Sequence, residues 1–219
     1  MRYGESYERL VKQGATHLIV VCLNSGASST YNAAVMAKNM FYDEHPGSDV
    51  VIEVIDSESY SIGYGWPVMQ ADKMIDKGED FDTIVSYLKN RLAKTEILVS
   101  AYTLKFLRKS GRVPAAAAFA GEALGLKPII TLIHGESKAV GKVRGEKAVI
   151  PELIKQYKKR AADPSGPYII GYTYEEYGKE LYSACVKELG HPPVLAGNLG
   201  CVISTNAGNR AVGMMYIGK

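Results

Sequence analysis

The sequence predicts an α/β fold in which a parallel-sheet α/β domain is followed by a mixed α+β domain. Short, β-branched apolar segments alternate with longer segments in which apolar residues recur every three or four positions. This alternation is typical of a parallel sheet covered by helices. The second half instead places several strands close together along the chain. We therefore expect a boundary near residue 100, with a parallel α/β domain at 1–100 and an α+β domain at 101–219.

The first half shows the alternation most clearly. Thr16–Leu23 is short, apolar and rich in β-branched residues, which favours a buried strand. Because helices separate the successive strands, we expect the strands to run parallel. The expected strands are Thr16–Leu23, Asp49–Ile55 and Glu96–Tyr102, and the expected helices are Ser29–Tyr42, Ile62–Lys77 and Asp80–Ala93.

The second half begins with a helix at Thr103–Ser110, which Gly111 is expected to end in a left-handed conformation. Pro114 suits the first turn of another helix through the alanine run that follows it. The Asn-Ala-Gly-Asn sequence between Gly200–Thr205 and Ala211–Ile217 predicts an antiparallel hairpin at the end of the chain. The elements expected between these are a strand at Lys127–Ile133, a Gly-Glu-Ser turn, a strand at Lys138–Val143, a helix at Pro151–Ala162, a strand at Tyr168–Thr173 and a helix at Glu175–Leu189.

The composition is that of an ordinary globular protein, with 47% hydrophobic and 22% charged residues. Three cysteines without a CxxC spacing do not favour a disulfide framework or a structural zinc site. The four histidines are scattered, so we expect no metal and no cofactor. No apolar run approaches the roughly 20 residues of a membrane-spanning helix, and the N-terminus lacks the layout of a secretory signal. We therefore expect a cytoplasmic protein without integral membrane association.

The charge is distributed unevenly. Residues 1–100 hold 9 Lys and Arg against 14 Asp and Glu, whereas residues 101–219 hold 17 against 9. A basic second half could attract an anionic protein, nucleotide or nucleic acid. A solvated basic surface explains the same charge equally well.

The most informative local feature is the loop Asn24–Tyr31 (NSGASSTY), between a predicted strand and a predicted helix. Open α/β sheets bind ligands at such loops, and the start of a helix favours an anion. Ser28 could donate a hydrogen bond to that anion, or it could simply be the N-cap of the helix. From the loop alone, the capping role is the simpler interpretation.

The second half offers three further basic candidates. Arg112 follows the helix break at Gly111, where its guanidinium could pair with a carboxylate or remain on the surface. Lys142 and Arg144 end a predicted strand and by themselves indicate only a solvated face. The sequence contains no GxSxG elbow, no phosphate loop and no complete dinucleotide fingerprint, so no catalytic motif is found.

Several segments form a specific pattern only in combination. They are Ser25–Tyr31 (against S-x-x-S-G-[TS]-Y), Val54–Ser57 with Ser61–Gly63, Thr103–Val113 (against TLxYLxKxGRI), Leu126–Ile130 with Gly135, Lys142–Arg144 (against K-x-R), and Gly200–Gly218. In this order they resemble the DegV family, whose FakB members are the acyl-binding subunits of bacterial fatty-acid kinase. The resemblance covers essentially the whole chain.

The resemblance implies a non-catalytic protein that binds a long-chain fatty acid in a buried pocket, in a cleft between its two domains. Such a protein shields the acyl chain and presents its carboxylate to a separate ATP-dependent fatty-acid kinase. The product, an acyl phosphate, enters bacterial phospholipid synthesis. Carried over by position, the residues around the carboxylate would be Ser28, Ser29, Arg112 and Asn206, and those that dock the kinase would be Lys142 and Arg144.

The chain departs from the family pattern in three places. Members usually begin with a further segment that carries the first strand and a T-S-Q-P motif, whose threonine also contacts the carboxylate, so the N-terminal domain is expected to be incomplete. Ser29 replaces the glycine of S-G-T-Y, where a positive φ becomes costlier. Asn206 stands at the histidine of H-x-G-[PS]-G, and Asn209-Arg210 replace its last two residues. An asparagine amide can donate a hydrogen bond but cannot carry charge.

Two other functions are weighed against fatty-acid binding. A small serine-dependent hydrolase or transferase would use Ser28 as its nucleophile, but no histidine lies near it in the sequence and no elbow is present. A regulatory or nucleic-acid binder would use the basic second half, which lacks a recognisable binding module with interleaved aromatic residues. We therefore expect no nucleic-acid partner.

Overall fold

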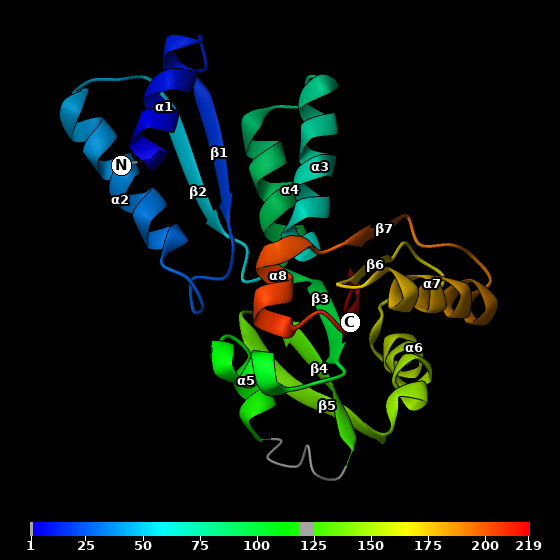
Figure 1. Ribbon diagram of the computed structural model, residues 1–219. Coiled ribbons are helices and arrows are strands. Elements are labelled where there is room, and N and C mark those ends of the chain that lie inside the picture. The colour runs from blue at the N-terminus through cyan, green and yellow to red at the C-terminus, as the bar shows by residue number, and fades with distance from the viewer. Residues whose placement is uncertain (1, 119–124) are drawn as a thin grey trace. The chain divides into compact units, whose positions relative to one another are not determined.

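The structure is a computed structural model that describes residues 2–118 and 125–219 (Figure 1). These residues fall into two compact units. The first contains the chain up to Tyr60 together with Tyr64–Ala93, and the second contains Ser61–Gly63 and Lys94–Lys219. Each unit has its own sheet and its own hydrophobic core.

The first unit is built on a two-stranded parallel sheet. β1 (His17–Cys22) and β2 (Val51–Asp56) pair residue by residue. The helix α2 (Thr30–Glu44) connects them, which confirms the predicted strand–helix–strand order. The other helices of this unit are α1 (Arg2–Lys12), α4 (Phe81–Ala93) and most of α3 (Ile62–Asp76).

Both faces of this small sheet are covered. Leu18 and Val20 of β1 pack with residues of α1 and α2, whereas Ile19 and Val21 pack with residues of α3 and α4. Figure 1 shows the two helix pairs on opposite sides of β1 and β2. Because successive side chains of a strand point to opposite faces, burial on both faces requires a continuous apolar run. This explains why the strand has no alternating polar residues.

The second unit is built on a six-stranded sheet of order β5-β4-β3-β8-β6-β7. β3 is antiparallel to both β4 and β8, β8 is antiparallel to β6, and β6 is parallel to β7. This mixed sheet agrees with the predicted fold class. The strands are β3 (Thr95–Ala101), β4 (Leu126–Ile133), β5 (Glu136–Arg144), β6 (Ile169–Tyr172), β7 (Leu195–Asn198) and β8 (Ala211–Ile217).

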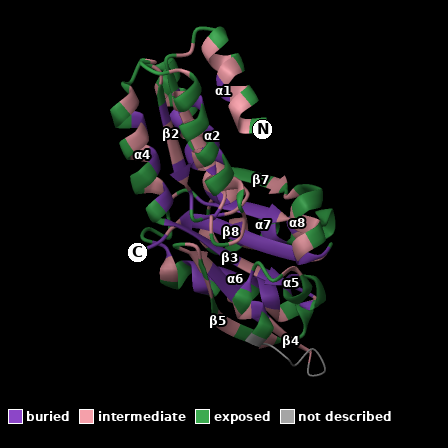
Figure 2. Cartoon of the chain, turned by 90° about the vertical axis from the view of Figure 1, so that its left-hand side faces the viewer, coloured by how far each residue is buried: buried purple, intermediate pink, exposed green. Residues whose placement is uncertain are grey.

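Helices cover both faces of the six-stranded sheet as well. Leu98 of β3 packs with residues of α6 and α7 on one face, and its neighbour Val99 packs with residues of α5 and α8 on the other. Figure 2 shows β3 and β8, at the centre of the sheet, as buried strands. The helices are α5 (Lys105–Ser110), η1 (Pro114–Ala118), η3 (Glu146–Ala148), α6 (Val149–Arg160), α7 (Glu175–Leu189) and α8 (Gly200–Ala207).

The predicted C-terminal hairpin is wrong. Gly200–Ala207 is the helix α8, and only Ala211–Ile217 is a strand, which pairs with β3 and β6. The β-branched residues before the turn favour a strand, but local hydrogen bonds support the helix. The first backbone N–H of α8 donates to Asn198 Oδ1 at 2.8 Å. The hydroxyls of Ser204 and Thr205 donate to carbonyls four residues earlier, a pattern that only a helix offers.

The placement of Glu96–Tyr102 in the parallel sheet is also wrong. The strand exists as β3, but it pairs antiparallel with β4 and β8. The helix that precedes β3 would allow the strand to pair in parallel with an earlier strand, but it does not require that pairing. Both strands that pair with β3 instead come later in the chain. β7 is a strand that the sequence pattern does not predict, because most of its residues are exposed.

Two local predictions can be compared directly with the backbone. Gly111 ends α5 with φ 67°, which confirms the left-handed cap, whereas the described residues after Gly111 form a 3₁₀ rather than an α-helix at Pro114–Ala118. The predicted Gly-Glu-Ser turn is displaced, because β4 and β5 are joined by His134 and Gly135, with φ 50° and 70°. Two consecutive positive φ values suit a two-residue hairpin loop, since they match the twist of the flanking strands.

Candidate functional site

The candidate site of the first unit is formed by the loops that follow β1 and β2. β1 ends at Cys22 and its loop leads to α2, while β2 ends at Asp56 and its loop leads towards α3. Because the strands are parallel, both loops leave the same edge of the sheet. Ligands bind at this edge in open α/β sheets.

Asn24 joins the two loops. It is only 3% exposed, and its backbone N–H donates to the carbonyl of Ser59 at 3.0 Å. Its side-chain Nδ2 donates to the hydroxyl of Tyr60 at 2.8 Å, and its Oδ1 accepts from the N–H of Gly26 at 3.0 Å. One buried amide therefore fixes the first loop against the second.

Asp56 supplies a second connection between the loops. Its carboxylate accepts hydrogen bonds from the N–H of Ser25, at 3.1 and 3.3 Å, and from the N–H of Glu58 at 2.9 Å. Glu58 has φ 51°, a conformation that is uncommon for a residue with a side chain. Neither Asn24 nor Asp56 is among the predicted ligand contacts, although both are polar residues close to the carboxyl end of a predicted strand.

Ser28 lies two residues before the first residue of α2. Its Oγ accepts a hydrogen bond from the N–H of Thr30 at 3.3 Å and lies 3.1 Å from Thr30 Oγ1. The N-cap of α2 is Ser29, which makes no side-chain capping bond, so the assignment of Ser28 as the N-cap is wrong by one residue. The φ of Ser29 is −77°, so the position of the family's glycine does not demand a positive φ in this chain.

The loop holds charges of both signs. The carboxylate of Asp56 accepts from the N–H of Ser25, whereas the first turn of α2 contains no acidic residue, so the backbone N–H groups of that turn keep a partial positive charge. A thiol nucleophile is not available nearby, because burial raises the pKa of Cys22, whose Sγ lies 3.9 Å from the hydroxyl of Tyr3. The loop is thus suited to holding an anionic group rather than to forming a covalent bond through a thiolate.

Arg112 and Asn206, the other predicted carboxylate contacts, belong to the second unit. Arg112 follows α5, and its Nη1 donates to the carbonyl of Ser110 at 2.6 Å. Asn206 lies on α8, where its Nδ2 donates to the carbonyl of Val202 at 2.8 Å. α5 and α8 cover the same face of the sheet. The predicted contacts of Arg112 and Asn206 with a fatty-acid carboxylate stay predictions.

Lys142 and Arg144 lie on β5, an edge strand of the six-stranded sheet. Both are exposed, and because they are two residues apart they share one face of the strand. Charged side chains on an edge strand also discourage pairing with another chain. Their position therefore suits either a docking surface or a protected edge.

Arg210 has a role that the sequence did not indicate. Its Nε donates to the hydroxyl of Tyr177 at 2.7 Å, and its Nη2 forms an ion pair with Glu146. The guanidinium carbon lies 5.6 and 5.2 Å from the ring centres of Tyr102 and Tyr177, distances that allow cation–π attraction. Arg210 therefore links the residue before β8 to α7 and to η3.

In the part of the chain that the structure describes, no helix has both the length and the apolar character needed to cross a membrane. The same part holds one group of three neighbouring side chains with metal-binding atoms, Glu8, Glu44 and His45. That group is separate from the loops described above.

Comparison with known sequences gives consistent matches. Residues 2–219 match the family model described as "Uncharacterised protein, DegV family". A DegV domain-containing protein of Caldanaerobacter subterraneus is 30% identical over 99% of this chain and 75% of its own length. One from Clostridium perfringens is 27% identical over 98% of this chain and 75% of its own length.

Solved structures agree with the sequence matches. A DegV family protein from Eubacterium eligens, loaded with heptadecanoic acid, has 26% identity and a TM-score of 0.83, over 99% of this chain and 76% of that one. A fatty-acid-binding DegV family protein from Thermus thermophilus has 26% identity and a TM-score of 0.84, with the same coverage. One from Streptococcus agalactiae has 27% identity and a TM-score of 0.84, over 100% of this chain and 76% of that one. On these matches, the chain belongs to the DegV family.

Proposed function

We propose that this chain binds a long-chain fatty acid, with the carboxylate held at the loop before α2, and that it is not itself a catalyst. The observation that carries the proposal is the arrangement at Ser28, where a hydroxyl lies beside the start of a helix whose first turn has no acidic residue. The fatty acids bound by the Eubacterium eligens and Thermus thermophilus relatives support the same ligand class.

The Ser28 hydroxyl has the hydrogen-bonding capacity that this role needs. Its oxygen accepts from the N–H of Thr30, and when Thr30 Oγ1 donates to it as well, the hydroxyl hydrogen of Ser28 is available for a ligand oxygen. Asn24 and Asp56 hold the surrounding loops in place before any ligand arrives. Such preorganisation reduces the entropy lost on binding.

Apolar burial would supply most of the affinity. A sixteen-carbon chain gains roughly 0.8 kcal/mol for each buried methylene, or about 11 kcal/mol before the costs of association. The polar contacts would orient the ligand and disfavour molecules without an acid group. Affinity and head-group selectivity therefore depend on different parts of the ligand and can be tested separately.

Lipid occupancy tests the proposed function directly. Native mass spectrometry of the purified chain, followed by solvent extraction, is expected to find about one fatty acid of roughly 14 to 18 carbons per chain, because burial of that many methylenes makes release slow. If the protein is isolated empty, it is expected to take up added oleate. An empty protein that also fails to bind oleate would contradict fatty-acid binding.

We further propose that the bound acid is presented to a separate ATP-dependent fatty-acid kinase, which docks through Lys142 and Arg144. Their exposure on one face of β5 supports this. The double variant Lys142→Glu/Arg144→Glu is expected to slow acyl-phosphate formation by a cognate kinase while oleate binding stays unchanged, because like-charge repulsion opposes docking. Lys138→Glu, at an exposed position of the same strand, is the matched control. Equal rates for all variants would exclude this docking surface.

A further inference from the structure

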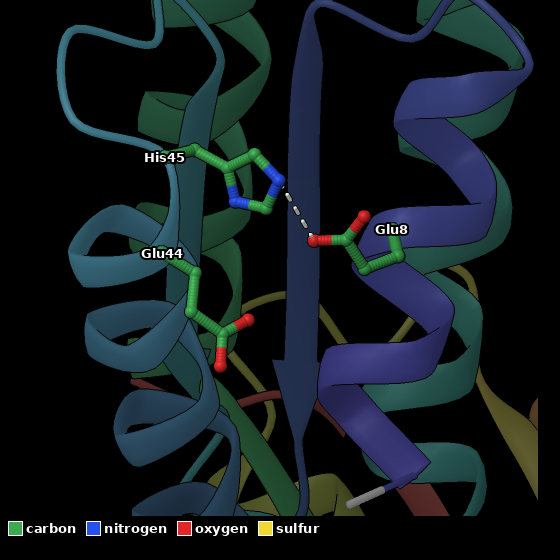
Figure 3. A group of neighbouring side chains, drawn as sticks. All are labelled: Glu8, Glu44 and His45. Carbon is green, nitrogen blue, oxygen red and sulfur yellow. Dashed lines mark ion pairs between the residues drawn. The ribbon is translucent and has the colours of Figure 1, made fainter.

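Three side chains from two helices of the first unit lie together, away from the loops of the proposed fatty-acid site (Figure 3). Glu8 projects from α1, Glu44 is the last residue of α2, and His45 is the C-cap of α2. One atom from each, an imidazole nitrogen and two carboxylate oxygens, lies within 4.8 Å of the other two. Nitrogen and oxygen atoms of these kinds are ligands for divalent metal ions.

The imidazole of His45 is oriented by the main chain. Its Nδ1 lies 2.9 Å from the carbonyl oxygen of Phe41. A carbonyl can only accept a hydrogen bond, so Nδ1 must carry the hydrogen. Histidines that bind metals commonly donate their second ring N–H to a carbonyl in this way, which fixes the ring and its tautomer. In the neutral ring, Nε2 is then left with its lone pair.

The Nε2 atom faces a carboxylate oxygen. His45 Nε2 lies 3.3 Å from Glu8 Oε1 (Figure 3). Two acceptors at this distance repel each other unless a cation, either a proton or a metal ion, lies between them. Glu8 Oε1 is shielded from solvent and makes no hydrogen bond within the described residues. The ammonium group of Lys12 lies 3.8 Å from the other oxygen, Oε2, and the Lys12 side chain is 78% exposed.

The helix backbones that carry these ligands are held together independently of any ion. The hydroxyl of Tyr7 on α1 donates to the carbonyl of Ala34 on α2 at 3.1 Å, in the buried core. Phe41 belongs to the same core, and its ring stacks on that of His45 with centroids 4.6 Å apart. With the backbones and the His45 ring held in place, the side chains of Glu8 and Glu44 are the parts that would rotate to bring the ligand atoms to the roughly 2.0–2.2 Å at which zinc binds nitrogen and oxygen.

We propose that Glu8, Glu44 and His45 bind a divalent transition-metal ion, with zinc as the best match, and that the ion clamps α1 to α2. An imidazole with two carboxylates suits zinc better than magnesium or calcium, which prefer sets made only of oxygen. Glu44 is exposed, so the site is open to solvent on one side and water completes the coordination. The proposal does not depend on the proposed fatty-acid function, because none of its residues lies in the loops around Ser28.

Zinc titration of the metal-free full-length chain tests the proposal, with a chromophoric chelator as competitor. The exposed Cys201 is replaced by serine in every sample so that its thiol takes no part. We expect about one zinc ion per chain, and a loss of affinity of about 100-fold or more in His45→Gln and in Glu8→Gln. Loss of an outer hydrogen-bond partner alone costs about 10- to 100-fold, and loss of a direct ligand should cost at least as much.

The matched control is His17→Gln, which replaces an exposed histidine of the same unit whose Nδ1 lies 3.0 Å from the hydroxyl of Thr16. Its zinc affinity is expected to stay within about threefold of that of the parent. If the parent takes up no zinc, or if His45→Gln binds it as tightly as the parent, the site does not exist and the cation beside Glu8 is a proton. Cobalt titration of the parent by isothermal titration calorimetry gives a second measurement, and a parent protein that binds no cobalt would also overturn the proposal.

Discussion

Ser28→Ala is expected to weaken oleate binding by about 10- to 100-fold. A hydrogen bond to a charged group contributes about 1.5–3 kcal/mol, and each 1.4 kcal/mol changes a dissociation constant about tenfold. The change removes the hydroxyl that lies beside the start of α2 but leaves the backbone N–H groups of the helix in place. Isothermal titration calorimetry with oleate measures the effect.

Methyl oleate separates a carboxylate contact from a general loss of binding. The ester has nearly the same apolar chain but no negative charge, so Ser28→Ala is expected to weaken its binding much less than that of oleate. Ser6→Ala is the control, because Ser6 lies on α1 and its hydroxyl donates to the carbonyl of Arg2. Equal losses for oleate and its ester would show that Ser28 supports the loop without contacting the carboxylate.

Thermal stability has to be measured on the same variant. Ser28 Oγ accepts from the N–H of Thr30 in the first turn of α2, and losing one intramolecular hydrogen bond costs about 1 kcal/mol of stability. The binding comparison therefore belongs at a temperature at which both proteins are folded. A loss of oleate affinity that persists there reflects the site rather than partial unfolding.

Glu96→Ala is expected to lower the free energy of unfolding by about 3–5 kcal/mol, because it breaks a buried charged pair and leaves its partner uncompensated. Glu96 is 2% exposed at the start of β3, and its carboxylate accepts from Arg160 Nε and from the hydroxyl of Thr131. Burial and the charge of Glu96 both raise the pKa of Tyr216, which keeps that phenol neutral. Urea denaturation monitored by circular dichroism measures the loss.

A double-mutant cycle distinguishes the ion pair from simple cavity formation. Arg160→Ala removes the other partner, whose side chain is 28% exposed, and leaves the carboxylate of Glu96, whose side chain is 3% exposed, as a buried unpaired charge, so its own cost should be at least as large. The double variant Glu96→Ala/Arg160→Ala is expected to be less destabilised than the sum of the two single changes, because neither charge is then left unpaired. Strict additivity, or a loss below about 1 kcal/mol for Glu96→Ala, would mean that the pair contributes little.

The local elements follow from the sequence with small errors at their ends. β1 lies within the predicted Thr16–Leu23, and α2 is two residues longer at its C-terminal end than the predicted Ser29–Tyr42. These elements are predictable because the burial of both faces of β1 leaves a continuous apolar run. Gly111 is predictable for a similar local reason, since a left-handed φ after a helix favours glycine.

The pairing of distant segments does not follow from the sequence. The apolar pattern of β3 is the same whether its neighbours are parallel or antiparallel, and the tertiary structure places it between β4 and β8. The segment at the start of α8 is rich in β-branched residues that are typical of strands. It is helical in the structure, where α8 covers the sheet beside α5, and its hydroxyls donate to carbonyls four residues earlier once the helix has formed.

For the candidate sites, the sequence by itself identified the loop that contains Ser28, because its small polar residues lie between a strand and a helix. It also contained the motifs that resemble the DegV family. Only the tertiary structure decided that Asp56 bonds to the N–H of Ser25 and that Glu8 faces His45. In both pairs the two residues come from different parts of the unit, far apart in the sequence. The physical reason is that local periodicity specifies which face of an element is buried, whereas the residues that meet across elements are set by how those faces pack.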